Sequence, residues 1–129
     1  MPNTIAEYFA DELVDWSHTI TFYEEELEIL EKKLGEVLRR NSIVDIAGKV
    51  EAQQNLLNNV SEKFYRLQVE FQQQEEMLKT DSTFIDNTFI NAETEKRQAE
   101  FRNKMQAVEK EYIDAKFDCY HFLSGTLKK

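Results

Sequence analysis

Apolar residues recur in alternating steps of three and four along the stretch from Ala6 to Val37. The members of this stripe are Ala6, Phe9, Leu13, Trp16, Ile20, Tyr23, Leu27, Leu30, Leu34 and Val37. Their mean spacing of about 3.5 residues keeps the stripe on one side of a slightly underwound helix. At about 1.5 Å per residue such a helix is roughly 50 Å long, and it cannot bury the stripe by itself. The rest of the chain must therefore supply helices that cover it.

Two later segments carry the same alternation. In the first, it runs through Ile43, Ile46, Val50, Gln53, Leu57, Val60, Phe64, Leu67, Phe71, Gln74 and Leu78. In the second, it runs through Phe101, Met105, Val108, Tyr112, Ala115, Cys119 and Phe122. Each segment therefore predicts another long helix with one apolar side.

Polar residues interrupt the alternation at a few positions. Gln53 and Gln74 occupy stripe positions of the second segment, where a buried amide can fix the register of packed helices or lie at the edge of an interface. Carried backwards from Phe101, the third stripe meets Gln98, Thr94 and Asn91. We therefore expect the first turns of the third helix to be loosely held or bent.

Capping and turn residues set the expected boundaries of the first two helices. Thr4-Ile5-Ala6-Glu7 has the pattern of a capping box, which starts a first helix at about residues 4–40. A break at Asn41-Ser42, with Ser42 or Asp45 as the cap, places the second helix at about residues 43–79.

The segment between the second and third helices is the least regular. Asp81-Ser82-Thr83 is typical turn and cap chemistry. Phe84, Ile85, Phe89 and Ile90 follow at helical spacing and predict a short helix at about residues 83–90 that folds over the end of the bundle. The third helix then spans about residues 91–124, where Ser124-Gly125 supplies a stop.

Long helices with short connections predict the fold. The 129 residues fit one domain, and only three Gly and one Pro, which is Pro2, are present to interrupt helices. A connection as short as the one near Asn41 turns the next helix back antiparallel. We therefore predict an all-α fold over residues 1–129 as a single domain, an antiparallel up-down-up three-helix bundle with long coiled-coil-like helices.

The charge of the chain narrows the classes of partner. The formal net charge is -9 and the pI is about 4.8, and such a field repels phosphate backbones and anionic lipids. No basic run is longer than Arg39-Arg40 or Lys128-Lys129, so we expect neither nucleic acid nor membrane binding. The single Cys119 excludes an intrachain disulfide, and no apolar run approaches the roughly 18 residues of a membrane span. We expect a cytoplasmic protein.

Each of the two histidines follows an aspartate by three residues, in the pairs Asp15/His18 and Asp118/His121. On a helix this spacing places both side chains on one face, as a carboxylate–histidine metal pair requires. Both histidines point away from the apolar stripes, and at 1.5 Å per residue they lie about 25–30 Å apart along the bundle. A metal site would need a second subunit to complete it, and two solvated surface pairs explain the pattern more simply. Within one chain we expect no metal and no cofactor.

The sequence lacks the motifs of the common catalytic sites. Cys119 falls on the third apolar stripe, which predicts a buried, inert thiol. His121 is only two residues along the helix and therefore faces elsewhere. Gly-rich phosphate loops, Gly-x-Ser-x-Gly and Cys-x-x-Cys are absent from the sequence. We therefore expect a protein that is not an enzyme.

Apolar residues outside the three stripes bear most directly on function. Phe22 and Ile29 lie seven residues apart, at one off-stripe position of the first helix. Ile113, Phe117 and Tyr120 form a second stripe on the third helix. Because aromatic residues are enriched at interface cores, these residues predict a protein–protein surface for a homodimer or a partner helix. The alternative is that they widen the core of the bundle.

The function expected from these features is that of a non-enzymatic helical protein-interaction or scaffolding module that forms a homo-oligomer. One alternative is a small helical metal-binding protein that uses the two Asp-x-x-His pairs across subunits. Another is a ligand carrier with a pocket lined by Trp16, Tyr23, Phe64 and Tyr112, although aromatic residues at stripe positions more often form plain core.

Overall fold

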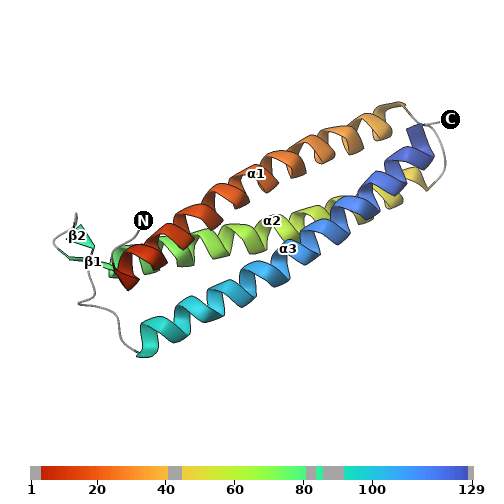
Figure 1. The fold of residues 1–129 in the computed structure, drawn as a ribbon. Coiled ribbons are helices and arrows are strands. Elements are labelled where there is room, and N and C mark those ends of the chain that lie inside the picture. The colour runs from red at the N-terminus through yellow and green to blue at the C-terminus, as the bar shows by residue number, and fades with distance from the viewer. Residues whose placement is uncertain (1–3, 41–44, 81–83, 86–91, 128–129) are drawn as a thin grey trace. The chain divides into compact units, whose positions relative to one another are not determined.

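A computed structural model describes residues 4–40, 45–80, 84–85 and 92–127. Three long helices, α1 (Ile5–Arg40), α2 (Ile46–Met77) and α3 (Ala92–Leu127), pack against each other (Figure 1). Two short strands, β1 (Lys79–Thr80) and β2 (Phe84–Ile85), lie between α2 and α3 in the chain. The predicted all-α three-helix bundle is confirmed. No helix within the described ranges combines the length and the apolar character that a membrane span requires.

The chain divides into two compact units, and each of the long helices contributes to both. The first unit consists of Met1–Thr21 and Phe64–Ala107, and the second of Phe22–Lys63 and Val108–Lys129. The first unit therefore combines the start of α1 with the end of α2 and the start of α3. The second combines the opposite ends of the same helices. Successive helices therefore run in opposite directions, which is the predicted up-down-up arrangement.

The stripe residues form the core of each unit. In the first unit the ring of Phe71 lies 5.2 Å from that of Trp16 and 5.3 Å from that of Phe101, measured between ring centroids. In the second unit Tyr23 and Tyr112 stack with their centroids 4.2 Å apart. Leucine, isoleucine and valine side chains from the stripes fill the remaining space and are almost completely buried, including Leu13, Ile20, Leu30, Leu34, Val50 and Leu57. Each such side chain contributes about 1.5–3 kcal/mol of transfer free energy to folding.

The ends of α1 and α2 follow the capping chemistry in part. The Oγ1 atom of Thr4 accepts a hydrogen bond of 3.1 Å from the amide of Glu7, so the predicted cap of the first helix is confirmed. Asp45 precedes α2 with a φ of 75°, and its carbonyl accepts from the amide of Lys49 at 3.2 Å. Aspartate tolerates this left-handed conformation better than most residues do. Ser42, the alternative cap, lies outside the described residues.

The end of α3 differs from the prediction, because the helix runs through Ser124-Gly125 to Leu127. Leu123 is buried in the core, and the hydroxyl of Thr126 donates to the carbonyl of Phe122 at 2.8 Å. The last turn therefore has its own packing and a local hydrogen bond. Gly125 has no positive φ, so it does not form the left-handed cap that would end the helix there.

The short helix predicted at about residues 83–90 is wrong at Phe84 and Ile85. These two residues pair antiparallel with β1, with Thr80 opposite Phe84 and Lys79 opposite Ile85 (Figure 1). Aromatic and β-branched residues favour extended backbone, and a helix of so few residues gains too little to offset its nucleation. The second helix, α2, ends at Met77, before the predicted residue 79, because Lys79 and Thr80 are extended in β1. The other residues of the predicted short helix, 83 and 86–90, lie outside the described ranges.

We predict that Gly35→Ala stabilises the fold by about 0.5–1 kcal/mol, because alanine loses less backbone entropy than glycine on forming a helix. A Cβ atom at this position of α1 would meet nothing within 4 Å beyond its chain neighbours and the adjacent backbone of its own helix. Thermal unfolding followed by circular dichroism measures the gain. Gly125→Ala, in the final turn of α3, is the matched control and should gain less, since helix ends fray. An unchanged or lower midpoint for Gly35→Ala would contradict the account of this position.

Candidate functional site

In the second unit, hydrogen bonds between α1 and α3 fix which sides of these helices face each other. Glu26 of α1 accepts a hydrogen bond from the hydroxyl of Tyr112, and its Oε2 atom lies 2.7 Å from the Nζ atom of Lys116. The hydroxyl of Tyr23 donates to Oε2 of Glu109 at 2.8 Å. The contact between α1 and α3 is therefore a layer of aromatic rings bordered by charge-assisted hydrogen bonds.

Contacts within this layer shift the pKa values of Tyr23, Glu26 and Tyr112. Hydrogen bonds from Lys116 and then Tyr112 lower the pKa of Glu26, so its carboxylate stays ionised and paired with the cation. Burial, followed by the hydrogen bond to Glu109, raises the pKa of Tyr23 to about 12. Burial and the hydrogen bond to Glu26 also raise the pKa of Tyr112. Glu26 and Lys116 therefore form a neutral pair, with both tyrosines protonated beside it.

Four exposed apolar side chains surround this neutral pair. They are Phe22 and Ile29 of α1 and Ile113 and Tyr120 of α3, with between 40% and 57% of each side chain accessible to solvent. Phe22 and Ile29 lie four residues before and three after Glu26, while Ile113 and Tyr120 lie three before and four after Lys116. Residues at these spacings are neighbours on a helix surface. The four side chains therefore form one surface over the Glu26–Lys116 pair, which we call the α1–α3 face.

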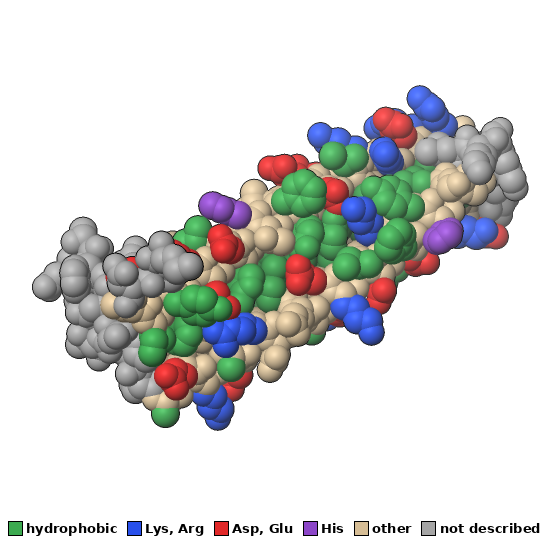
Figure 2. Space-filling view, in the orientation of Figure 1, with side chains coloured by type: hydrophobic (Ala, Val, Ile, Leu, Met, Phe, Trp, Pro, Cys, Tyr) green, Lys and Arg blue, Asp and Glu red, His purple; other side chains and the backbone are tan. Residues whose placement is uncertain are grey.

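The space-filling view shows hydrophobic side chains gathered between charged ones along α1 and α3 (Figure 2). Phe22 also packs edge-on against Tyr23, with ring centroids 6.2 Å apart. The Nζ atom of Lys116 lies 5.8 Å from the ring centroid of Tyr120, within the range of a cation–π contact. Two of the four exposed residues are therefore held by the layer beneath them, as a preorganised surface requires.

Phe117, the fifth residue of the predicted surface, lies elsewhere. Its side chain is exposed, but it lines a groove between α2 and α3 together with Leu56 and Val60 of α2. The predicted set is therefore divided between two surfaces of the second unit. Spacing along α3 alone could not reveal this, because it does not say which neighbouring helix lies on each side.

The predicted metal ligands do not converge on one site. Asp15 and His18 belong to the first unit and Asp118 and His121 to the second, and all four residues are exposed. Oδ2 of Asp118 accepts a hydrogen bond of 3.3 Å from the amide of Gln53. Among the described residues, no group of three or more His, Cys, Asp or Glu side chains is arranged to hold a metal ion. The metal site across subunits stays a prediction.

The other predicted chemical residues pack as core. Cys119 is buried, and burial raises its pKa to about 11, so the thiol is neutral and unreactive. The four aromatic residues proposed to line a carrier pocket contact protein or are buried. Trp16 packs on Phe71, Tyr23 stacks on Tyr112, and Phe64 is completely buried. These contacts favour the core interpretation over the pocket.

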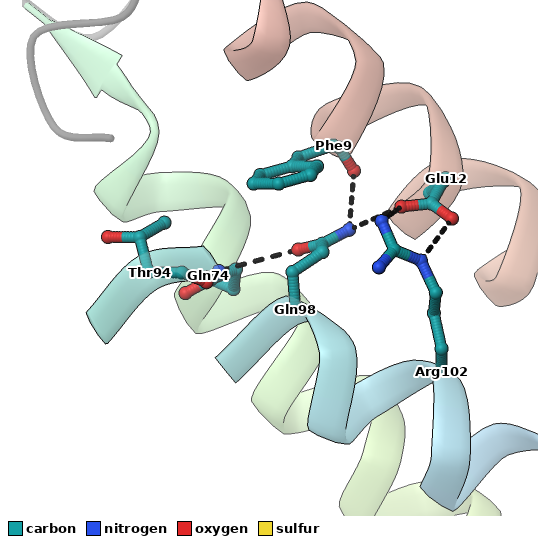
Figure 3. Close-up of polar contacts among 6 residues, drawn as sticks. All are labelled: Phe9, Glu12, Gln74, Thr94, Gln98 and Arg102. Atoms are coloured by element: carbon teal, nitrogen blue, oxygen red, sulfur yellow. Dashed lines mark hydrogen bonds and ion pairs between the residues drawn. The ribbon is translucent and has the colours of Figure 1, made fainter. Parts of the chain in front are cut away.

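The first unit contains a buried polar layer that joins all three helices (Figure 3). The amide nitrogen of Gln98 donates to the carbonyl of Phe9 at 3.2 Å and to Oε1 of Glu12 at 3.1 Å. Glu12 also forms two hydrogen bonds with the guanidinium of Arg102, at 2.7 and 2.8 Å. The amide nitrogen of Gln74 lies 3.4 Å from Oε1 of Gln98 and reaches toward α3 from α2.

The polar layer corrects the expectation that α3 begins loosely. Thr94 and Gln98 are almost completely buried, and α3 is helical from Ala92 onward. Gln74 is buried as well, with its amide nitrogen also 3.4 Å from the carbonyl of Thr94. Burial of Gln74 favours the interpretation in which an amide at a stripe position fixes the register of the packed helices. Gln53 is half-buried and bonds to Asp118 at the edge of the helix contact instead.

We predict that Gln98→Leu destabilises the protein by about 1–3 kcal/mol, because it leaves buried groups of Phe9, Glu12 and Gln74 without this partner. The double variant Gln74→Leu/Gln98→Leu should lose less than the sum of the two single losses, since it removes both amides together. Urea unfolding of the three variants measures the coupling. Strictly additive losses would show that the two glutamines act independently.

We also predict that Glu26→Gln weakens the dependence of stability on acid pH. The pKa of Glu26 is lower in the folded chain than its ordinary value of 4.5. The unfolded chain therefore takes up the proton first, so the contribution is present above that ordinary value and is lost as the pH falls through the folded pKa. Lys116→Met, which removes the cation, should flatten the same part of the curve. Urea unfolding across the acid range tests both variants, and an unchanged slope would contradict the assignment.

Comparison of the chain with protein-family models, with curated proteins and with solved structures gives no match. What a partner could bind is therefore judged from the residues of this chain alone. The two features that stand out are the apolar surface over the Glu26–Lys116 pair and the groove beside Phe117.

Proposed function

We propose that this protein is a non-enzymatic helical interaction module that self-associates, as a homodimer, through the α1–α3 face. The observation that carries the proposal is the set of four exposed apolar side chains, Phe22, Ile29, Ile113 and Tyr120, around the Glu26–Lys116 ion pair. Isolated exposed apolar residues are ordinary, whereas a contiguous group with charged residues around it is typical of interaction sites.

The balance of charge supports a second copy as the partner. The chain carries a net charge of -9, so two copies repel each other over most of their surfaces. Self-association is most favourable where the local net charge is small. Beneath the α1–α3 face Lys116 balances Glu26, which leaves the Glu109 carboxylate that accepts from Tyr23 as the remaining charge of this layer. A twofold axis would bring the same four apolar side chains of each copy together. Aromatic and aliphatic residues at the centre of an interface contribute most of its affinity.

We also propose that the protein acts in the cytoplasm and binds neither nucleic acid nor membranes. The net negative charge argues against nucleic acid and anionic lipid, and the single Cys119 argues against a disulfide-built secreted protein. The alternative function, metal binding by Asp15/His18 and Asp118/His121 across subunits, has support only from the exposure and helical spacing of those pairs.

We predict that Phe22→Glu combined with Ile113→Glu weakens self-association by at least about thirtyfold, because each substitution places an unpaired charge in an apolar contact. Both residues are exposed in the single chain, so the variant should keep the helical content of the wild type. Sedimentation velocity over a range of concentrations measures association, and circular dichroism checks the fold. The control is Tyr65→Glu, which changes an aromatic residue of α2 that is 64% exposed.

The control variant should associate like the wild type. The proposal fails if the double variant also does so, or if the wild type sediments as a monomer at every concentration. Should the double glutamate variant lose its helical content, Phe22→Ser combined with Ile113→Ser provides the same test without added charge.

A further inference from the structure

The groove beside Phe117 differs in chemistry from the α1–α3 face. It lies between α2 and α3 within the second unit and has a volume of about 530 Å³. Its apolar lining includes Leu56 and Val60 from α2 and Phe117 from α3. Phe117 is 59% exposed and Leu56 is 42% exposed, while Val60 is buried beneath them. The groove therefore offers a partner an apolar floor with two large side chains at its edge.

Carboxylates line the α3 side of this groove. Glu111, Asp114 and Asp118 all lie along it, at the spacing of successive helical turns. Lys63 of α2 forms an ion pair with Glu111 at 2.5 Å and balances one of the three charges. Asp118 accepts a hydrogen bond from the amide of Gln53 on α2, and this amide carries no charge. Two carboxylates, those of Asp114 and Asp118, therefore give the groove a net negative charge when His121, which also lines it, is counted as neutral.

We propose that this groove docks a cationic amphipathic helix from another protein. An apolar side chain of that helix would sit against Leu56 and Phe117, and lysine or arginine residues beside it would pair with Asp114 and Asp118. Asp114 and Asp118 are four residues apart, which is about 6 Å along a helix axis. Two basic residues at the same spacing on the partner helix would meet both carboxylates.

Charge distinguishes this cationic helix from a second copy of the chain. Another copy of the chain, with its net charge of -9, would bring more negative charge to the two aspartates. On the α1–α3 face, by contrast, Lys116 balances Glu26, and one carboxylate of that layer, Glu109, is left rather than two. The two surfaces of the second unit are therefore suited to different partners, and Phe117 belongs to the acidic one. This inference does not depend on the self-association proposed above.

The probe is a synthetic helical peptide of roughly five turns, with leucines along one side and lysines flanking them. A matched peptide carries glutamate in place of each lysine. Fluorescence anisotropy with the full chain, at low and at physiological salt, measures both affinities. The lysine peptide is expected to bind and the glutamate peptide is not, with affinity falling as salt screens the carboxylates.

Variants of the protein distinguish binding in this groove from general attraction of the peptide to an acidic protein. Asp114→Asn combined with Asp118→Asn should weaken binding of the lysine peptide about tenfold. Phe117→Ser, which leaves every charge in place, should also weaken it about tenfold. The matched control is Glu28→Gln combined with Glu31→Gln, which removes two charges that line a different groove of the second unit. That control should change the affinity less than threefold.

Three results would each overturn the proposal. The first is an equal loss of affinity in the control and in the aspartate variant, which would indicate attraction by net charge alone. The second is unchanged binding by Phe117→Ser. In the third, the aspartate variant changes the sedimentation of the protein but not its affinity for the peptide, and the groove then holds a second copy. The Phe22→Glu/Ile113→Glu variant should bind the peptide like the wild type, so failure of the dimer would not count against the groove.

Discussion

The apolar stripe of α1 must be covered, and the rest of the structure follows from this requirement. A helix of 36 residues with one apolar side gains little stability in water until other helices pack on that side. The chain supplies α2 and α3, which place stripes of the same period against it. Once the stripes are buried, the opposite sides of the helices are left to solvent or to partners. Single apolar side chains on those outer sides are ordinary, but folding of one chain does not explain a group of them in one place.

Much of the fold could be predicted, because the period of the apolar residues identifies both the helices and their buried sides. The polar layer of Gln74, Gln98 and Glu12 could not, since its hydrogen bonds join residues up to 90 positions apart in the chain. Gln98 occupies a stripe position, so its burial follows from the period, but its acceptor on Phe9 depends on the packing of α1. The extended backbone at Phe84 was missed because a short apolar cluster fits a helix and a strand equally well.

The candidate surfaces show the same division. Spacing identified Phe22, Ile29, Ile113, Phe117 and Tyr120 as lying outside the stripes, and all five are exposed in the structure. Spacing could not distinguish Phe117 from the others, because the position of a residue around one helix does not show which other helix lies beside it. The bonds from Glu26 to Tyr112 and Lys116 show which sides of α1 and α3 meet. Those bonds also pair Lys116 with Glu26, so the proposed dimer surface carries less net negative charge than the acidic groove.

The central claim is that the α1–α3 face joins two copies of this chain. A native mass spectrum of the full chain, purified without tag or chelator, tests it most directly. We predict a dimer at the mass of two metal-free chains, which dissociates on dilution. A monomer at every concentration would contradict the claim. A dimer that carries stoichiometric extra mass, and that falls apart when a chelator removes this mass, would contradict it as well and would favour the aspartate–histidine pairs.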